Sequence, residues 1–362
     1  MIYFLLMAVL ALVVWLGTLL WVEAGQLPRG QRLERVRQSP QWADGEFHNQ
    51  ETTPQFTGDK SALRVMWDFM FSKMDGLSPL NPVPTVKTDL KAIQRHEEVV
   101  VWLGHSSVFV QTGGKRFLFD PVLTATLPVT LFMRPFKGAD TYTPADLPPV
   151  DYLIITHDHW DHLDYHTVKA LRKRVGAVVC PLGVGQHFEY WGYEAHLVHE
   201  MDWGDSLAID STATLRCLPA RHFSGRLLGR NRTLWASYLI DGARRIYVSG
   251  DGGYDRRFAA IGKKYPGIDL AIMENGQYNA DWRYIHMMPH LLPQAVDDLG
   301  AGRLLTYHNS KYALARHRWN EPLDSIASAA RGHGWQLLTP RIGQPVNLEA
   351  SQAQQFDRWW EF

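Results

Sequence analysis

The chain opens with one uncharged, strongly apolar run at residues 1–22. A helix needs about 20 such residues to cross the hydrocarbon core of a bilayer. A cleavable signal peptide is the alternative, since Val22-Glu23-Ala24 loosely resembles a cleavage site. However, no basic residue precedes the run, and the run exceeds the roughly 7 to 15 apolar residues of a signal core. The pattern therefore predicts an uncleaved, single-pass transmembrane helix at residues 1–22.

Residues 23–89 lack a sustained period and carry several prolines, so we interpret them as a linker and N-terminal extension. Within them, residues 62–74 are apolar at helical spacing and predict an amphipathic helix. We favour packing of this helix against the domain that follows, because such stripes usually face a core. The alternative is a helix that lies in the membrane interface.

From residue 98 the pattern changes to short apolar runs with period two, separated by glycine turns. Strands separated by helical stretches indicate an α/β fold, with two mixed β-sheets face to face and helices outside. This domain is expected to span residues 90–362. The predicted strands are 99–103, 107–111, 116–119, 152–155, 177–180, 212–218, 235–240, 245–249, 270–273 and 303–306, and the predicted helices are 167–174, 184–191 and 292–299.

Charge and cysteine content narrow the classes of function. Lys and Arg number 37 and balance 37 Asp and Glu, so there is no net basic field to attract nucleic acid. Cys180 and Cys217 lie in apolar strands and are expected to be buried free thiols. The predicted location is a bacterial inner membrane. Basic residues follow the apolar run, which favours the cytoplasmic side for the domain and leaves the periplasmic side as the alternative. The oligomeric state stays open, a homodimer included.

One short segment, residues 156–162, carries the strongest candidate chemistry. It follows an apolar strand and reads Thr-His-Asp-His-Trp-Asp-His. His157 and His159 are two apart and project to the same side of an extended chain, while Asp161 and His162 can turn toward a neighbouring point. Imidazole and carboxylate are the usual ligands of zinc-like ions, so the loop offers part of the coordination of two metals. A solvated loop with chance histidines is the alternative, and Asp158 and Asp164 are interpreted as loop or helix-capping residues.

Further ligand candidates follow other apolar strands, at their carboxyl ends. These are His222, Asp251 and His308. Strand ends from distant parts of the chain can converge on one edge of a sandwich and hold their side chains rigidly. Together the candidates complete two coordination sets. We assign one metal to His157, His159 and His222, the other to Asp161, His162 and His308, with Asp251 bridging both.

The order His-x-His-x-Asp-His, then His, Asp and His, resembles the metallo-β-lactamase superfamily. Within it, the chain is similar to the N-acyl-phosphatidylethanolamine-hydrolysing phospholipase D family. The resemblance implies an αββα sandwich with a dinuclear zinc site, although other divalent metals stay open. The chain departs from the sequence pattern of the family at Gly252, at Glu274-Asn275-Gly276 and at Met288. Further matching stretches are 39–42, 102–106, 120–121, 147–151, 181–183, 250–254, 286–289 and 308–315.

The resemblance implies a hydrolase acting on a lipid phosphodiester at a membrane. Two metals about 3.5 to 4 Å apart lower the pKa of a shared water toward ~7, and the resulting metal-bound hydroxide would attack phosphorus. Asp161 and Asp251 would act through the metals. The resemblance also points to His286 as a group that orients the substrate or protonates the leaving alkoxide. His105 is expected to hydrogen-bond the metal loop, and His290 to be a polar residue before a helix.

Three alternatives stay open. The first is a lactonase or small-molecule phosphodiesterase on the same scaffold. The second is an iron-dependent oxidoreductase, because the type of ligand does not fix the metal. The third is a non-catalytic, membrane-tethered metal-binding protein, which is disfavoured because structural zinc sites are usually closed and hold one ion.

Overall fold

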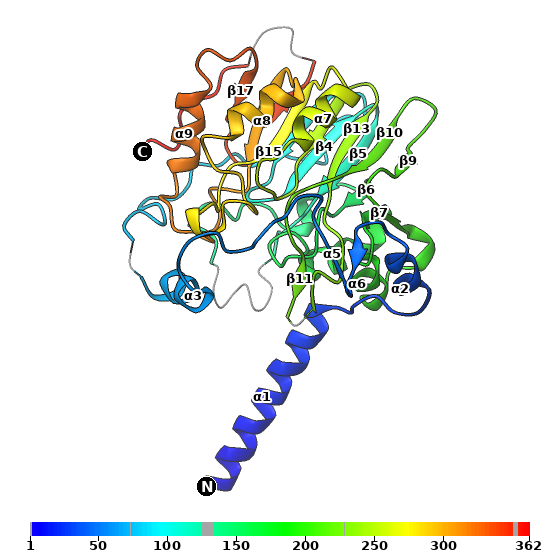
Figure 1. Cartoon of the computed structure of the whole chain (residues 1–362), viewed down its shortest axis with the longest axis vertical. Coiled ribbons are helices and arrows are strands. Elements are labelled where there is room, and N and C mark those ends of the chain that lie inside the picture. The colour runs from blue at the N-terminus through cyan, green and yellow to red at the C-terminus, as the bar shows by residue number, and fades with distance from the viewer. Residues whose placement is uncertain (1, 73, 125–133, 228, 350–353) are drawn as a thin grey trace.

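The computed structural model describes residues 2–72, 74–124, 134–227, 229–349 and 354–362. Met1 of the predicted transmembrane run and Lys73 of the predicted helix 62–74 lie outside them. Helix α1 (Ile2–Ala24) projects from the body of the molecule (Figure 1). Within the described residues it is the one helix long and apolar enough to cross a membrane. Its apolar side chains are largely exposed, which is consistent with the predicted anchor.

The body contains two seven-stranded sheets within the described part of the chain. The first has the order β18-β3-β4-β5-β6-β7-β8. Strands β3, β4 and β5 form an antiparallel meander, and β5 to β8 run parallel. The strands are β3 (Val99–Trp102), β4 (Val108–Thr112), β5 (Lys115–Phe119), β6 (Val150–Ile154), β7 (Val175–Pro181), β8 (Val198–Met201) and β18 (Pro345–Asn347).

The second sheet has the order β17-β16-β15-β14-β13-β10-β9. Its strands β14 to β17 are parallel, and β13 and β14 form an antiparallel hairpin. The strands are β9 (Ser206–Ala208), β10 (Thr214–Leu218), β13 (Ser237–Asp241), β14 (Arg245–Val248), β15 (Leu270–Glu274), β16 (Arg303–Tyr307) and β17 (Gln336–Leu338).

Alternation along the strands divides the core into three layers. In β3, Val100 faces the core between the sheets, whereas Val101 faces the core beneath α5 (Tyr165–Leu171) and α6 (Gly185–Tyr190). A third core lies between the second sheet and three further helices. The chain is therefore an αββα sandwich, as predicted. The helices that cover the second sheet are α7 (Arg257–Lys264), α8 (Leu292–Leu299) and α9 (Glu321–Ala329).

Several short elements were not predicted from the sequence. Helix α2 (Gly30–Arg37) buries only Val36 and is held by ion pairs from Arg32 to Glu189 and Glu200, so it has no apolar stripe to recognise. Helices α7 and α9 are eight and nine residues long, which gives their period little room to repeat. Strands β8, β9, β17 and β18 were also missed. The remaining elements are β1 (Trp42–Ala43), β2 (Glu46–Phe47), β11 (Gly225–Arg226), β12 (Gly229–Arg230) and the 3-10 turns Pro144–Asp146, Arg172–Arg174, Ala195–Leu197 and Ala280–Trp282.

The predicted amphipathic helix is α3 (Ala62–Phe71), and it begins at Ser61, whose side chain caps it. Val65 faces the body and is buried. The favoured interpretation, packing onto the domain, therefore holds for one face. The opposite face exposes Leu63, Trp67 and Phe71.

Candidate metal centre

The loop after β6 places its ligand candidates at the edge of the sandwich. The loop turns back on itself, because the amides of His162 and Leu163 donate to the carbonyl of His159 at 3.1 and 2.9 Å. Its first residue bridges the sheets, since the Ala236 amide donates to the Thr156 carbonyl at 2.8 Å. The side chains that follow are thus fixed at the carboxyl ends of strands from both sheets.

Three imidazoles converge at one point, and we call them half-site A: His157, His159 and His222. The Nδ1 atom of His159 lies 2.9 Å from Nε2 of His157 and 3.2 Å from Nε2 of His222. A tetrahedral zinc ion with Zn–N bonds of about 2.0–2.1 Å would hold its nitrogens about 3.3 Å apart. The spacing of the three nitrogens therefore fits one shared cation.

A second group, which we call half-site B, combines Asp161, His162 and His308. The Nε2 atom of His308 lies 3.1 Å from Nε2 of His162 and 3.3 Å from Oδ2 of Asp161. A carboxylate oxygen and two ring nitrogens at this spacing also fit one cation.

Asp251 lies between the half-sites. Its Oδ2 atom is 3.2 Å from Nε2 of both His162 and His308 in half-site B. The same oxygen is 4.0 and 3.9 Å from Nε2 of His157 and His222 in half-site A. Its Oδ1 atom is buried and has no hydrogen-bond partner in the described part of the chain. A buried carboxylate oxygen without a partner, beside facing ring nitrogens, fits a site for two metal ions.

The structure thus brings together all seven residues predicted as ligands and supports a dinuclear metal site. Which residue binds which ion stays a prediction. The residues are His157, His159, Asp161, His162, His222, Asp251 and His308.

The charge states differ between the half-sites. In half-site A, burial holds the pKa values of His157 and His222 well below the usual range and lowers that of His159 to about 4. In half-site B, burial alone would lower the pKa of His162, but surrounding carboxylates raise it well above the usual value. Half-site A therefore offers neutral rings, the form that binds metals. Half-site B pairs the carboxylate of Asp161 with a protonated His162, and a divalent cation would take the place of that proton.

Asp120, which follows β5, orients His162. Its Oδ2 atom accepts a hydrogen bond from Nδ1 of His162 at 2.8 Å, which turns Nε2 toward half-site B. The amide and hydroxyl of Thr156 donate to the same carboxylate at 2.7 and 2.6 Å. Asp120 and His308 both have left-handed backbone, with φ of 41° and 65°. Non-glycine residues in this conformation are uncommon and gather at functional sites.

Asp158 supports the loop from behind, as its predicted structural role requires. It is buried and accepts hydrogen bonds from the Gly225 amide and the Thr233 hydroxyl at 2.8 Å each. Nε2 of His187 lies 3.2 Å from its Oδ2 atom. Burial would raise the pKa of Asp158, but these contacts, that of His187 foremost, lower it to about 2. Asp164 caps α5, also as predicted.

Arg226 ties the end of α1 to the metal loop. Its guanidinium is buried and donates to the carbonyls of Asp158 and Leu163 at 3.1 and 2.7 Å. It also donates to the carbonyls of Glu23 and Ala24 at 2.7 and 3.2 Å. The first residues after the predicted anchor are therefore part of the support of the candidate metal centre.

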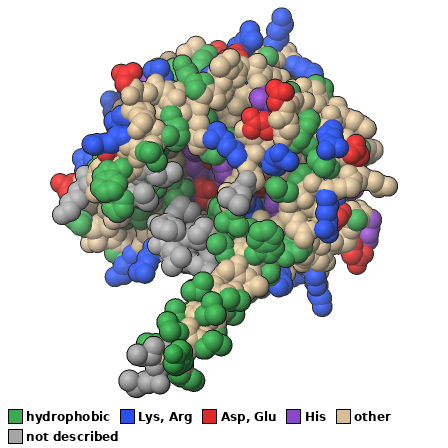
Figure 2. Space-filling model, turned by 60° about the horizontal axis from the view of Figure 1, so that its bottom comes forward, with side chains coloured by type: hydrophobic (Ala, Val, Ile, Leu, Met, Phe, Trp, Pro, Cys, Tyr) green, Lys and Arg blue, Asp and Glu red, His purple; other side chains and the backbone are tan. Residues whose placement is uncertain are grey.

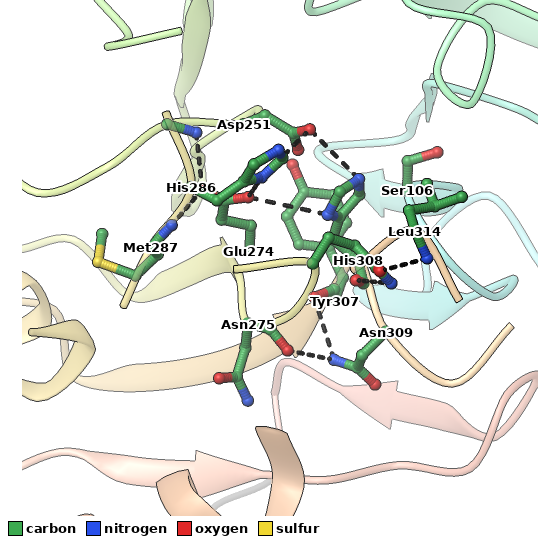
Figure 3. Close-up of polar contacts among 12 residues, drawn as sticks. Ser106, Asp251, Glu274, Asn275, His286, Met287, Tyr307, His308, Asn309 and Leu314 are labelled. Carbon is green, nitrogen blue, oxygen red and sulfur yellow. Dashed lines mark hydrogen bonds and ion pairs between the residues drawn. The ribbon is translucent and has the colours of Figure 1, made fainter. Parts of the chain in front are cut away.

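His286 lies beside the metal-ligand candidates and is held by Glu274 (Figure 3). Its Nδ1 atom is 2.9 Å from Oε2 of Glu274 and 3.9 Å from Oδ2 of Asp251. The other oxygen of Glu274 accepts hydrogen bonds from the backbone amides of Gly252 and Met287 at 2.7 and 2.8 Å. Burial would lower the pKa of His286, but Glu274 raises it. Because Nδ1 is engaged, Nε2 is the ring atom left to meet a ligand.

His105 and His290 lie as predicted. Nε2 of His105 lies 2.9 Å from Oδ2 of Asp161, so His105 contacts the metal loop. Burial lowers the pKa of His105 to about 3. His290 is exposed in the turn before α8.

Two supporting carboxylates, Asp120 and Glu274, were not recognised as functional from the sequence. Both come at the carboxyl end of an apolar strand. This was the signal that identified Asp251 and His308, and applying it to every strand would have found them.

A pocket of about 340 Å³ opens above the ligand candidates. Figure 2 shows acidic and histidine side chains at the bottom of a hollow on the face from which α1 leaves. The pocket floor is polar, with His159, Asp161, Asp251, His286 and His308. Its walls are mainly apolar and include Phe56, Val65, Phe69, Phe223, Trp282 and Leu314.

The sandwich and the paired half-sites define a metal-dependent hydrolase of the αββα class. Residues 115–309 match the family model described as beta-lactamase superfamily domain. This match covers more than half of the chain. The chain belongs to the metallo-β-lactamase superfamily.

Three sequence relatives show how the likeness is distributed. An uncharacterised protein of Mycobacterium tuberculosis is 36% identical over 331 residues, which cover 89% of this chain and 88% of the relative. N-acyl-phosphatidylethanolamine-hydrolyzing phospholipase D 1 of Caenorhabditis elegans is 35% identical over 197 residues, covering 50% of this chain and 54% of that protein. Outer membrane protein RomA of Klebsiella pneumoniae is 50% identical over 125 residues, covering 34% of this chain and 88% of that protein.

Two solved structures share the fold. Igni18, a metallo hydrolase of Ignicoccus hospitalis, has a TM-score of 0.55 at 18% identity. The match covers 71% of this chain and 100% of Igni18. CmlA, a diiron beta-hydroxylase of Streptomyces venezuelae, has a TM-score of 0.53 at 21% identity and covers 70% of this chain and 54% of its own. At these identities the likeness shows the fold alone.

Proposed function

We propose that the protein is a membrane-anchored dinuclear zinc hydrolase that cleaves N-acyl-phosphatidylethanolamine-like lipids as a phospholipase D-type phosphodiesterase. The observation that carries this proposal is the composition of the pocket. Its polar floor suits an anionic phosphodiester, and its apolar walls suit acyl chains. The similarity to the Caenorhabditis elegans phospholipase over half of this chain supports the same substrate class.

The residues of the site have separate roles in this proposal. Half-sites A and B, with Asp251 between them, would hold two zinc ions. Bound there, the ions would lower the pKa of a water and neutralise the phosphoryl oxygens. His286, whose Nδ1 contacts Glu274, would donate a proton from Nε2 to the leaving alkoxide. Water adds to phosphorus and the P–O bond to the ethanolamine breaks, which yields phosphatidic acid and an N-acylethanolamine.

The anchor gives this reaction a location. Helix α1 would keep the pocket at the membrane that contains the substrate, which raises the effective substrate concentration. We propose a bacterial inner membrane as the location, with the body on the cytoplasmic side because Arg29, Arg32, Arg35 and Arg37 follow the span. Binding of nucleic acid is not part of the proposal.

The test uses the full chain in detergent micelles, because Arg226 bonds the end of α1 to the metal loop. Metal content per chain is measured, and release of N-acylethanolamine is followed with Asp251→Asn as control. Two zinc ions with metal-dependent release that the variant lacks would support the proposal. Turnover of lactones or small phosphodiesters alone would assign the site to the first alternative. Two iron ions without hydrolysis would favour an oxidoreductase.

A further inference from the structure

Helix α3 presents apolar side chains on two opposite faces. Leu63, Trp67 and Phe71 are 84%, 58% and 59% exposed and recur every four residues, so they form one stripe. Val65 and Phe69 lie on the opposite face and line the pocket above the metal-ligand candidates. A helix whose solvent-facing stripe is this apolar is unusual for a helix that contacts only water.

The junction of α1 with the body indicates where a bilayer would lie relative to α3. A helix needs about 20 apolar residues to cross the hydrocarbon core, and α1 stays apolar and largely exposed up to Trp21, just before the buried Glu23. The body begins immediately afterwards, since the indole of Trp191 donates to the Val22 carbonyl at 2.8 Å and Ala24 is buried. No linker separates span from body. The body must therefore rest on the membrane surface.

The face that rests there carries both α3 and the pocket mouth. In Figure 1, α3 and the base of α1 lie at the same end of the molecule, opposite α7. Figure 2 views this end and shows an apolar patch, the base of α1 and the hollow on one face. Helix α3, the base of α1 and the pocket mouth therefore lie at one end of the molecule.

We propose that α3 is an interfacial helix that lies in the headgroup layer of the bilayer. Its outer stripe (Leu63, Trp67 and Phe71) contacts lipid, and its inner face (Val65 and Phe69) walls the pocket, so that an amphiphile passes from the leaflet into the site along one helix. Tryptophan and phenylalanine suit this layer. The inference rests on the membrane anchoring within the proposed function and not on the reaction.

The test attaches a fluorescent label to single cysteines in the full chain. Native Cys180 and Cys217 are both fully buried, so a new surface cysteine takes the label. Leu63→Cys, Trp67→Cys and Phe71→Cys are compared with Lys263→Cys on α7, an exposed position at the far end. The chains are reconstituted in phosphatidylethanolamine and phosphatidylglycerol vesicles containing nitroxide-labelled lipid, and quenching is measured with this lipid and with aqueous iodide.

The labels on α3 should be quenched by the nitroxide lipid and protected from iodide, and the α7 label should show the reverse. Equal iodide quenching at all four positions overturns the proposal. So does protection from both quenchers on α3, which would mean that protein covers the stripe. Neither readout involves turnover, so a failure here is distinct from a failure of the proposed reaction.

A second variant guards against an effect of the label itself. Leu63→Glu with Trp67→Glu should expel the stripe from the headgroup layer, so a label at position 71 should lose its quenching by lipid and gain quenching by iodide. Unchanged metal content would show that the body is intact. Retention of lipid quenching at position 71 would contradict the proposal.

Discussion

Half-sites A and B meet at Asp251 but are built and supported differently. Half-site A consists of imidazoles held by neutral groups, since Nδ1 of His222 donates to the Ile285 carbonyl at 2.7 Å. Half-site B contains a carboxylate of its own, and the carboxylate of Asp120 holds His162 through a contact of 2.8 Å between Oδ2 and Nδ1.

This difference makes the two positions unequal toward metals. Neutral imidazoles favour zinc and related transition metals, whereas carboxylates also accept harder ions such as Mn²⁺ and Mg²⁺. Half-site B attracts a cation through the carboxylate of Asp161, and half-site A selects it through nitrogen. The two ions should therefore bind with different affinities, and a substitution in one half-site can weaken the binding of one ion alone.

The largest effect is expected from Asp251→Asn, because Asp251 is within 4.0 Å of ring nitrogens in both half-sites. Loss of its charge should weaken both ions and reduce kcat/KM by more than the roughly 10–100-fold typical of an outer partner. Metal content after dialysis and steady-state rates measure this. Asp44→Asn, an exposed matched control, should change neither. A variant that keeps two ions and full activity would remove Asp251 from its bridging role.

The next effect is specific to half-site B. In Asp120→Asn, the amide no longer offers the carboxylate that orients His162, so the affinity of half-site B should fall by about 10–100-fold. The affinity of half-site A should be unchanged. Zinc titration against a competing chelator resolves the two dissociation constants. An equal loss of metal affinity at both half-sites would contradict the independence of the two half-sites.

These supports also show what the sequence could and could not predict. Period-two patterning and strand ends predicted the sandwich and the convergence of His222, Asp251 and His308. The sequence does not state which strand ends adjoin, however. Asp120 meets Thr156 only because β5 pairs in parallel with β6.

Contacts between distant segments were equally hidden. Arg226 donates to the Glu23 carbonyl across 203 residues, so the start of the predicted linker supports the metal loop and is not free. Such a contact depends on the tertiary packing of two polar groups, so no local sequence pattern predicts it. Glu274 was noticed only as a departure from the family, and its contact with His286 gives that departure a physical role.

A smaller effect is expected from Glu274→Gln, which touches the proton donor more than the metals. The amide can still accept backbone hydrogen bonds, so both metal affinities should be nearly unchanged. His286 loses the neighbour that raises its pKa, so kcat should fall by about tenfold or more. A donor must be protonated, so the alkaline limb of kcat should move to lower pH.

A double-mutant cycle sharpens this expectation. If Glu274 acts only through His286, Glu274→Gln combined with His286→Asn should be no slower than His286→Asn alone. Additive losses would instead give Glu274 an independent role, through His308 at 3.7 Å.

The smallest effect is expected from a substitution in the pocket wall, which should change lipid binding without changing metal binding in either half-site. Phe69 lines the pocket and its ring centroid lies 6.5 Å from that of Trp282. In Phe69→Ala, loss of apolar contact should cost about 1 kcal/mol of lipid binding, or roughly fivefold in KM. Short-chain substrates should lose less than long-chain ones, and kcat and both metal affinities should stay constant. If either metal affinity changed, the wall and the floor of the pocket would be one coupled unit, and the contrast between half-sites A and B would need to include α3.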